Sequence, residues 1–79
     1  MFKPGIYQHY NGNLYHAIGI CRHSETLEEM VLYRALYADY GMWIRPKAMF
    51  DETVLINGKT VERFKFVRNI NLEPPQLHE

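Results

Sequence analysis

The chain has 79 residues, of which 47% are hydrophobic and 14% aromatic, and nine Lys and Arg residues are balanced by nine Asp and Glu residues. This length predicts one domain, and the apolar content is too high for a disordered chain. A formal net charge of zero argues against a duplex nucleic-acid-binding domain, because phosphate contacts favour a basic excess. One cysteine excludes an intrachain disulfide, and no apolar run is long enough to span a bilayer, so we expect a cytoplasmic protein.

The N-terminal part of the sequence predicts a β-hairpin. Residues 6–10 alternate and are rich in β-forming side chains, and Asn11-Gly12 is the pair that a two-residue type I′ turn prefers. Residues 14–22 then form the return strand. Neither face of this strand is plainly polar, so we expect both faces to be covered. Gly19 indicates a bulge or a bend within it.

Residues 23–29 are polar and interrupt the strand pattern, so we interpret them as a loop. A helix over 26–39 is the competing interpretation, because Thr26 and Glu29 have the spacing of a capping box. The alternation of residues 30–37, with Val and Tyr side chains on one face, favours a strand instead. We therefore predict a strand over 30–37.

The remainder of the chain predicts short strands and tight turns. In chain order these are a turn at 38–41, a strand at 43–45 that ends at Pro46, a helical turn at 47–51, a strand at 52–56, a hairpin turn at Asn57-Gly58 and a strand at 60–67. Residues 69–79 have little to bury, so we expect a flexible tail after a single domain over 1–68. The pattern predicts an all-β fold, a small antiparallel barrel or strongly bent sheet of about five to six short strands with one short helical turn.

Several motifs in this order resemble the signature of a family of short bacterial proteins catalogued as a domain of unknown function. They are Tyr7-Gln8-His9-Tyr10-Asn11-Gly12, His23-Ser24-Glu25-Thr26, Tyr33-Arg34-Ala35-Leu36-Tyr37, Trp43-Ile44-Arg45-Pro46 and Met49-Phe50. The resemblance covers residues 4–66 and implies an SH3-like barrel, but it implies no activity. The sequence departs from the family pattern at Asn11, where relatives often have a basic residue, and at Glu62, where a proline often precedes the Arg-Phe pair.

The cluster His23-Ser24-Glu25-Thr26 holds the side chains best suited to chemistry. His23 and Glu25 could form an acid–base pair, because histidine titrates near neutral pH. Adjacent side chains of an extended strand point apart, so His23 is poorly placed to activate Ser24 as a nucleophile. A binding loop and a turn in which Ser24 and Thr26 satisfy backbone groups are the other interpretations.

A metal site would draw on His9, His16, Cys21 and His23. The tight first turn would place Tyr7 opposite His16, which puts His9 and His16 together on the face away from Cys21. No familiar zinc spacing is present. We therefore predict no metal and no cofactor.

An aromatic and basic set is formed by Tyr33, Tyr37, Trp43 and Arg45. Tyr33 and Tyr37 share a face of one strand, and Trp43 and Arg45 share a face of the next, so together they could form a stacking platform. The alternative is that the aromatic side chains fill the core and Arg45 packs across Trp43. Four further side chains are predicted to fill the core: Met30, Met42, Met49 and Phe50.

These patterns favour a non-catalytic recognition module. Its expected binding residues are His23, Ser24, Glu25, Thr26, Tyr33, Tyr37, Trp43 and Arg45. A neutral chain suits a peptide or protein partner better than duplex nucleic acid, although a short single strand can bind through stacking. The rival interpretations are a small ligand-sensing or hydrolase-like domain that uses His23 and Glu25, and a structural accessory module that acts only in an assembly. We expect no membrane partner, and a monomer or a dimer.

Overall fold

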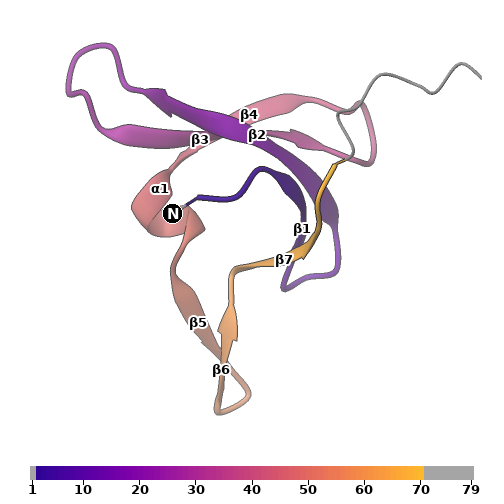
Figure 1. The fold of residues 1–79 in the computed structure, drawn as a ribbon. Coiled ribbons are helices and arrows are strands. Elements are labelled where there is room, and N and C mark those ends of the chain that lie inside the picture. Colours follow the sequence, from indigo (N-terminus) through magenta and orange to yellow (C-terminus); the bar gives the residue numbers. More distant parts are fainter. Residues whose placement is uncertain (1, 71–79) are drawn as a thin grey trace, which may run out of the picture.

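The computed structural model describes residues 2–70, and most of them lie in short β-strands. In chain order the elements are β1 Gly5–His9, β2 Leu14–Arg22, β3 Glu29–Ala35, β4 Met42–Pro46, α1 Lys47–Phe50, β5 Thr53–Ile56, β6 Lys59–Glu62 and β7 Phe64–Arg68. An antiparallel five-stranded sheet has the order β4-β3-β2-β1-β7, and β5 and β6 form a separate ribbon that projects from it (Figure 1). The all-β prediction is confirmed, and β3 is a strand rather than a helix. No helix within residues 2–70 has the length and apolarity that a bilayer crossing needs. Most of the predicted tail, 71–79, lies outside the described residues.

The turn between β1 and β2 is longer than the Asn-Gly pair predicts. The Gly12 N–H donates to the His9 carbonyl at 2.8 Å, and the His9 N–H donates to the Asn13 carbonyl at 2.9 Å, so the loop runs from Tyr10 to Gly12. Gly12 has a φ of 102°, as expected for the left-handed position that closes such a loop. Side chains stabilise the longer form, since the Asn11 Oδ1 accepts the Asn13 N–H at 3.0 Å. The two-residue turn was therefore the wrong prediction.

This longer turn changes the register of the first hairpin. Tyr7 pairs with Tyr15 instead of the predicted His16. His9 consequently packs on the same side as Tyr15, with the two ring centroids 6.4 Å apart, while His16 faces the other side of the sheet. The prediction that His9 and His16 share a face is wrong. The bulge expected at Gly19 is present, because the pairing of β2 with β3 shifts there.

The two faces of β2 are unequally covered. Tyr15 and Ala17 are buried, whereas Leu14 and Ile18 are exposed. Ile20 is exposed as well, although the register shift at the bulge places it opposite the buried Val31. The prediction that both faces of this strand are covered is therefore wrong. We call the covered side, which carries Tyr15, Ala17, Tyr33 and Ala35, the core face of the sheet, and the opposite side its outer face.

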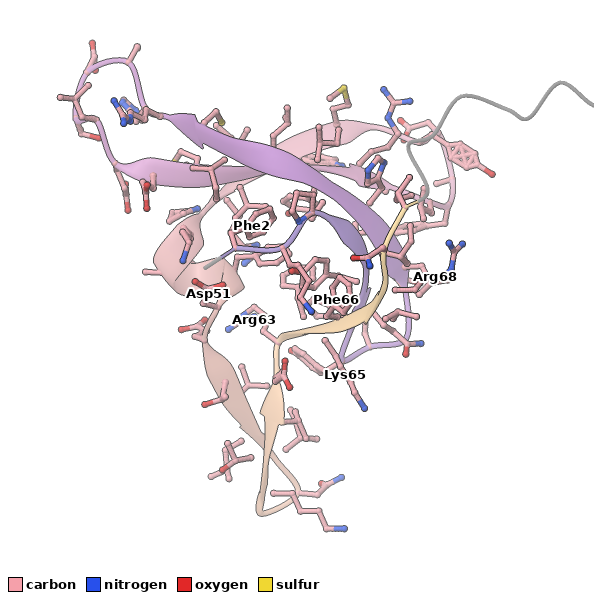
Figure 2. The ribbon with its side chains drawn as sticks, viewed as in Figure 1. Phe2, Asp51, Arg63, Lys65, Phe66 and Arg68 are labelled. Carbon is pink, nitrogen blue, oxygen red and sulfur yellow. The ribbon has the colours of Figure 1, made fainter. Side chains whose placement is uncertain are left out.

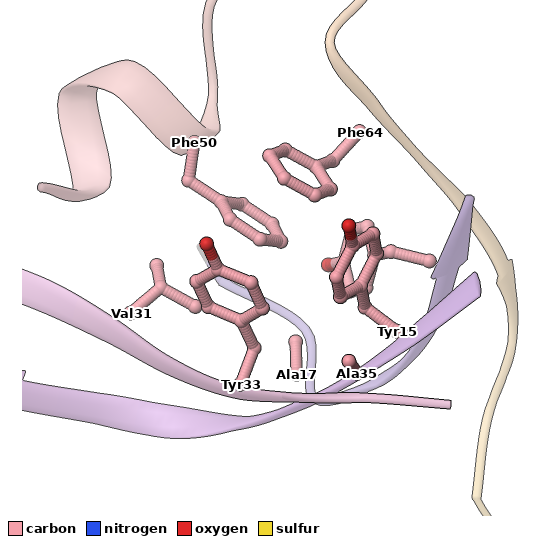
Figure 3. Packing of buried hydrophobic residues seen from close by; sticks show 8 residues of the cluster. Tyr15, Ala17, Val31, Tyr33, Ala35, Phe50 and Phe64 are labelled. Atoms are coloured by element: carbon pink, nitrogen blue, oxygen red, sulfur yellow. The ribbon is translucent and has the colours of Figure 1, made fainter. Parts of the chain in front are cut away.

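The core lies between two parts of the fold (Figure 3). The core face of β2 and β3 lies on one side, and α1 and the start of β7 lie on the other. Phe50 of α1 is 2% exposed and stacks on Phe64 of β7, with ring centroids 4.3 Å apart and planes within 6°. Tyr15 and Tyr33 meet the Phe64 ring edge-on at 5.6 and 5.8 Å. Offset and edge-on contacts are the favourable geometries for aromatic rings. Large aromatic side chains thus fill most of a small core, as the composition predicts.

The predicted strand over 60–67 is broken at Arg63, between β6 and β7 (Figure 2). The Arg63 N–H donates to the Glu52 carbonyl at 3.1 Å, and its own carbonyl accepts the Tyr10 N–H at 3.0 Å. The Arg63 guanidinium also bonds to the Glu52 carboxylate, with Nη2 2.6 Å from Oε1. These contacts direct the chain out of the ribbon and into the sheet. Because Glu52 and Tyr10 are distant in sequence from Arg63, the local alternation predicted one continuous strand.

The β5-β6 turn follows the sequence prediction. Asn57 and Gly58 have φ values of 50° and 76°, and Ile56 pairs with Lys59 across them. Two central residues with positive φ identify the tight hairpin turn that Asn-Gly pairs prefer.

Candidate functional site

The loop between β2 and β3 uses its polar side chains to hold its own backbone. The His23 Nδ1 accepts N–H groups from Glu25 at 3.1 Å and Thr26 at 3.3 Å. The Thr26 Oγ1 accepts the Glu28 N–H at 3.2 Å. His23 is half-buried and Ser24 is exposed. One imidazole nitrogen is thus occupied inside the loop. The turn interpretation predicts the Thr26 bond, whereas the His23 bonds were not predicted.

The structure does not bring this loop together with the aromatic set. Arg22 pairs with Glu29, beyond the end of β4, where Pro46 pairs with Met30. The loop therefore extends past the rest of the sheet (Figure 1). Strands advance about 3.3 Å per residue, so Tyr33 lies about 13 Å along β3 from Glu29, where the loop ends. The eight predicted binding residues fall into two separate regions.

Within the aromatic set, Tyr33 and Trp43 have different roles. They are directly opposite each other on β3 and β4 and point to the same face. Tyr33 is buried in the core at 6% exposure, whereas Trp43 is 59% exposed. Tyr37 lies beyond the end of β3 and bonds through its hydroxyl to the Tyr15 hydroxyl at 2.8 Å. Trp43 is therefore the member of the set best placed to meet a ligand.

Arg45 lies next to Trp43 on the same face of β4, opposite Val31. Its guanidinium carbon is 5.6 Å from the centre of the Phe64 ring, a cation–π contact. Its Nε is buried and has no hydrogen-bond partner within residues 2–70. A guanidinium placed over an aromatic ring can also form bidentate hydrogen bonds with an added group.

Among the strands of residues 2–70, β4 is an edge of the sheet and pairs with β3 alone. The Ala35 N–H donates to the Gly41 carbonyl at 3.0 Å, in the same register as the β3-β4 pairs. Because successive residues of a strand direct their backbone groups to opposite edges, those of Met42, Ile44 and Pro46 point away from β3. Within residues 2–70 they have no strand partner.

This edge is apolar as well as open. Met42 is 48% exposed and Ile44 is 55% exposed. The prediction that Met42 and Met49 fill the core is wrong, because both side chains are exposed. The same prediction is right for Met30 and Phe50, which are buried. The opposite edge strand, β7, carries Lys65 and Arg68, which point outward (Figure 2). Charged side chains on an edge strand disfavour an added strand, whereas an apolar edge strand favours one, so β4 is the more receptive of the two edges.

A groove that the sequence did not indicate lies between the β1-β2 turn and the β5-β6 ribbon. Its volume is about 560 Å³, and its lining includes Gln8, His9, Tyr10, Thr53, Glu62 and Lys65. It depends on the break at Arg63, which separates the ribbon from the sheet. Because local alternation gives no sign of that break, the groove could not be found from the sequence.

The surroundings of the His9 imidazole beside this groove disfavour its protonated form. Burial lowers the pKa of His9 below its ordinary value, and the positive charges of Arg45 and Arg63 act in the same direction. Its Nδ1 accepts the Asn11 N–H at 3.1 Å, and its ring lies 4.9 Å from that of Phe64.

Within the described part of the chain, no three His, Cys, Asp or Glu side chains lie close enough together to form a metal site.

Alkaline pH should destabilise the fold through Tyr15. Burial, followed by the hydrogen bond to Tyr37, raises the pKa of Tyr15 from 10.0 to about 12. The folded state thus holds this proton more tightly than the unfolded state. The corresponding stability is fully present below pH 10 and is lost as the pH rises toward 12. Urea unfolding at a series of pH values should show this fall.

The Tyr15→Phe variant should lose stability less steeply over the same pH range. Part of the fall should remain, because burial also raises the pKa of Tyr7. Equal slopes for the variant and the parent chain would contradict the role assigned to the Tyr15 proton.

Comparisons with known proteins agree with this architecture. A family model described as a protein of unknown function, DUF1653, matches residues 5–66. A DUF1653 protein from Bordetella bronchiseptica, known from a crystal structure, has 39% sequence identity to this chain. The two structures superpose with a TM-score of 0.81 over 91% of this chain and 95% of that chain. The search of curated proteins found no match. The chain belongs to the DUF1653 family of proteins of unknown function.

Proposed function

We propose that the chain is a non-catalytic recognition module that binds an extended segment of a partner protein along the outer edge of β4. The observation that carries this proposal is the open apolar edge, where Trp43 and Ile44 are 59% and 55% exposed beside unpaired backbone groups. An added strand satisfies such groups, and its alternate side chains meet the two faces of the sheet. The backbone contacts would supply affinity, and the side chains of β4 would supply selectivity.

The proposed contacts on the core face are Trp43, Arg45 and Tyr37. Tyr33 supports Trp43 from the core, and the loop at 23–26 lies outside this surface. Trp43 offers a flat apolar anchor, and Arg45 can donate to carbonyl or carboxylate groups of the added strand. The neutral charge of the whole chain suits a protein partner, since it supplies no general attraction for a phosphate backbone.

We also infer the fold type, the origin and the location of the protein. We describe the bent sheet with its short helix as an SH3-like barrel, a fold that often binds peptides on aromatic surfaces. A bacterial origin is supported by the Bordetella bronchiseptica relative. A cytoplasmic location is supported by the single cysteine, which fits a reducing compartment.

Amide NMR during titration with a pool of short extended peptides tests the proposal. Shifts should concentrate at 42–46 and at the neighbouring residues of β3. Trp43→Ala should weaken binding by roughly 30-fold, the effect of losing an interface anchor worth about 2 kcal/mol. Leu55→Ala is the matched control, because Leu55 is 72% exposed but lies on the ribbon.

A parallel titration with an oligothymidylate separates the ligand classes. Shifts at 42–46 with the oligonucleotide but not with the peptides, weakening as salt is added, would reassign the surface to single-stranded nucleic acid. An unchanged spectrum in both titrations would remove the recognition function from this edge.

A further inference from the structure

We infer that the strand which adds to β4 is β4 of a second copy of this chain, paired antiparallel about a two-fold axis through Ile44. This inference rests on the proposed function and names the partner of the same edge. It follows from the register of the outward backbone groups, from the side chains that this register brings together, and from the charge of the whole chain.

The backbone of β4 is complementary to itself in this register. The outward groups belong to Met42, Ile44 and Pro46, as the pairing with β3 requires. Centred on Ile44, each Ile44 N–H donates to the Ile44 carbonyl of the second copy. Each Met42 N–H likewise donates to the Pro46 carbonyl of the second copy, which also accepts the first bond of α1 as its N-cap and uses its second lone pair here. The N–H that proline lacks falls at the end of the pair, where its loss costs least.

The same register matches the side chains. On the core face, Trp43 lies opposite Arg45 of the second copy, and the symmetry repeats the pair. Directly opposed residues of antiparallel strands interact, and a guanidinium beside an indole is an attractive pair. On the outer face, Ile44 meets Ile44 and Met42 meets Pro46, so the exposed apolar side chains cover one another.

Neighbouring registers fit less well. Centring the pair on Arg45 places two Arg45 side chains directly opposite each other, and like charges in that position are destabilising. Centring it on Trp43 places Arg45 opposite Gly41 and leaves Pro46 outside the overlap of the two β4 strands. The register centred on Ile44 is therefore the one that pairs all of β4 without opposing two charges.

Other features of the chain allow two copies to associate and disfavour the addition of further copies. The formal net charge is zero, so the copies do not repel each other at long range. The second edge of the sheet, β7, carries Lys65 and Arg68, which disfavour strand addition there. An isologous contact uses the same patch on both copies and closes as a dimer rather than a fibre.

Sedimentation analysis of the full chain, from micromolar to millimolar concentration, tests the inference. The mass should rise from that of one chain to that of two. Ile44→Lys places two like charges at the two-fold axis and should keep the chain monomeric throughout. Because Ile44 is exposed in the single chain, this variant should keep the parent fold in amide NMR spectra. Leu55→Lys, on the ribbon, should dimerise like the parent.

The outcomes separate the inference from the proposed function. A parent chain that stays monomeric, or an Ile44→Lys variant that dimerises as strongly as the parent, overturns the inference. If the chain is monomeric and the peptide pool still shifts residues 42–46, the recognition function stands with a different partner. If the chain is monomeric and the peptides have no effect, both proposals fail.

Discussion

Phe50→Ala is expected to lower the free energy of unfolding by about 3–5 kcal/mol, the usual cost of deleting a buried phenyl ring. Phe50 is 2% exposed, stacks on Phe64 with ring centroids 4.3 Å apart, and meets Tyr7 edge-on at 5.0 Å. It is also the buried residue of α1, so alanine would detach the helix from the core. Small domains have total stabilities of about 5–15 kcal/mol, so this loss should leave the variant close to unfolding.

Urea denaturation followed by circular dichroism measures this loss. Phe50→Leu should cost less than Phe50→Ala, because leucine refills part of the space. Leu55→Ala, at a 72% exposed position, should change stability by less than about 0.5 kcal/mol. A loss below about 1 kcal/mol for Phe50→Ala would mean that α1 does not contribute to the core as described.

Gly5→Ala should also be strongly destabilising, although it adds a single methyl group. A Cβ at position 5 would lie 2.6 Å from the Arg68 carbonyl oxygen and 2.9 Å from the Phe66 ring. The φ of 152° is a further obstacle for a residue with a side chain. Overpacking costs about 1–3 kcal/mol, and an unfavourable backbone conformation adds about 1–3 kcal/mol. The pairing of β1 with β7 should therefore loosen.

Gly19→Ala is the matched control for this change. Apart from its two chain neighbours, no described residue has a heavy atom within 4 Å of a Cβ at position 19, so this variant should fold with nearly the parent stability. Thermal unfolding of both variants gives the comparison, and amide exchange should show lost protection in β1 and β7 for Gly5→Ala alone. Equal melting temperatures for the two variants would contradict the close approach of β7 to Gly5.

The two Asn-Gly pairs show what sequence patterns could and could not predict. Asn57-Gly58 forms the tight turn that the dipeptide favours, and it fixes the register of β5 and β6. Asn11-Gly12 forms a longer loop, because side chains of Asn11 and His9 accept N–H groups within it. Local propensity was sufficient for the first turn. The second depended on bonds made by neighbouring side chains, and the register of β1 and β2 followed from them.

The sequence indicated only part of the candidate edge, and it did not indicate the exposure of that edge. Trp43 and Arg45 were identified from their chemistry and their shared strand face, which the structure confirms. Whether Met42 and Ile44 are buried depends on which strand lies at the edge of the sheet. Alternation within β4 does not contain this information, because strand order is set by contacts between distant segments. The break at Arg63 was missed for the same reason, since it depends on Glu52 and Tyr10.

The pairing of β1 with β7 also constrains how the chain folds during its synthesis. Tyr7 needs Phe66 as its neighbour across the sheet, and Phe50 needs Phe64 as its stacking partner. Both partners are synthesised after β1 to β6, so the hairpins that emerge earlier from the ribosome have an incomplete core to pack against. The final fold must therefore form late, after β7 has left the exit tunnel, and the first strand remains available to other contacts until then.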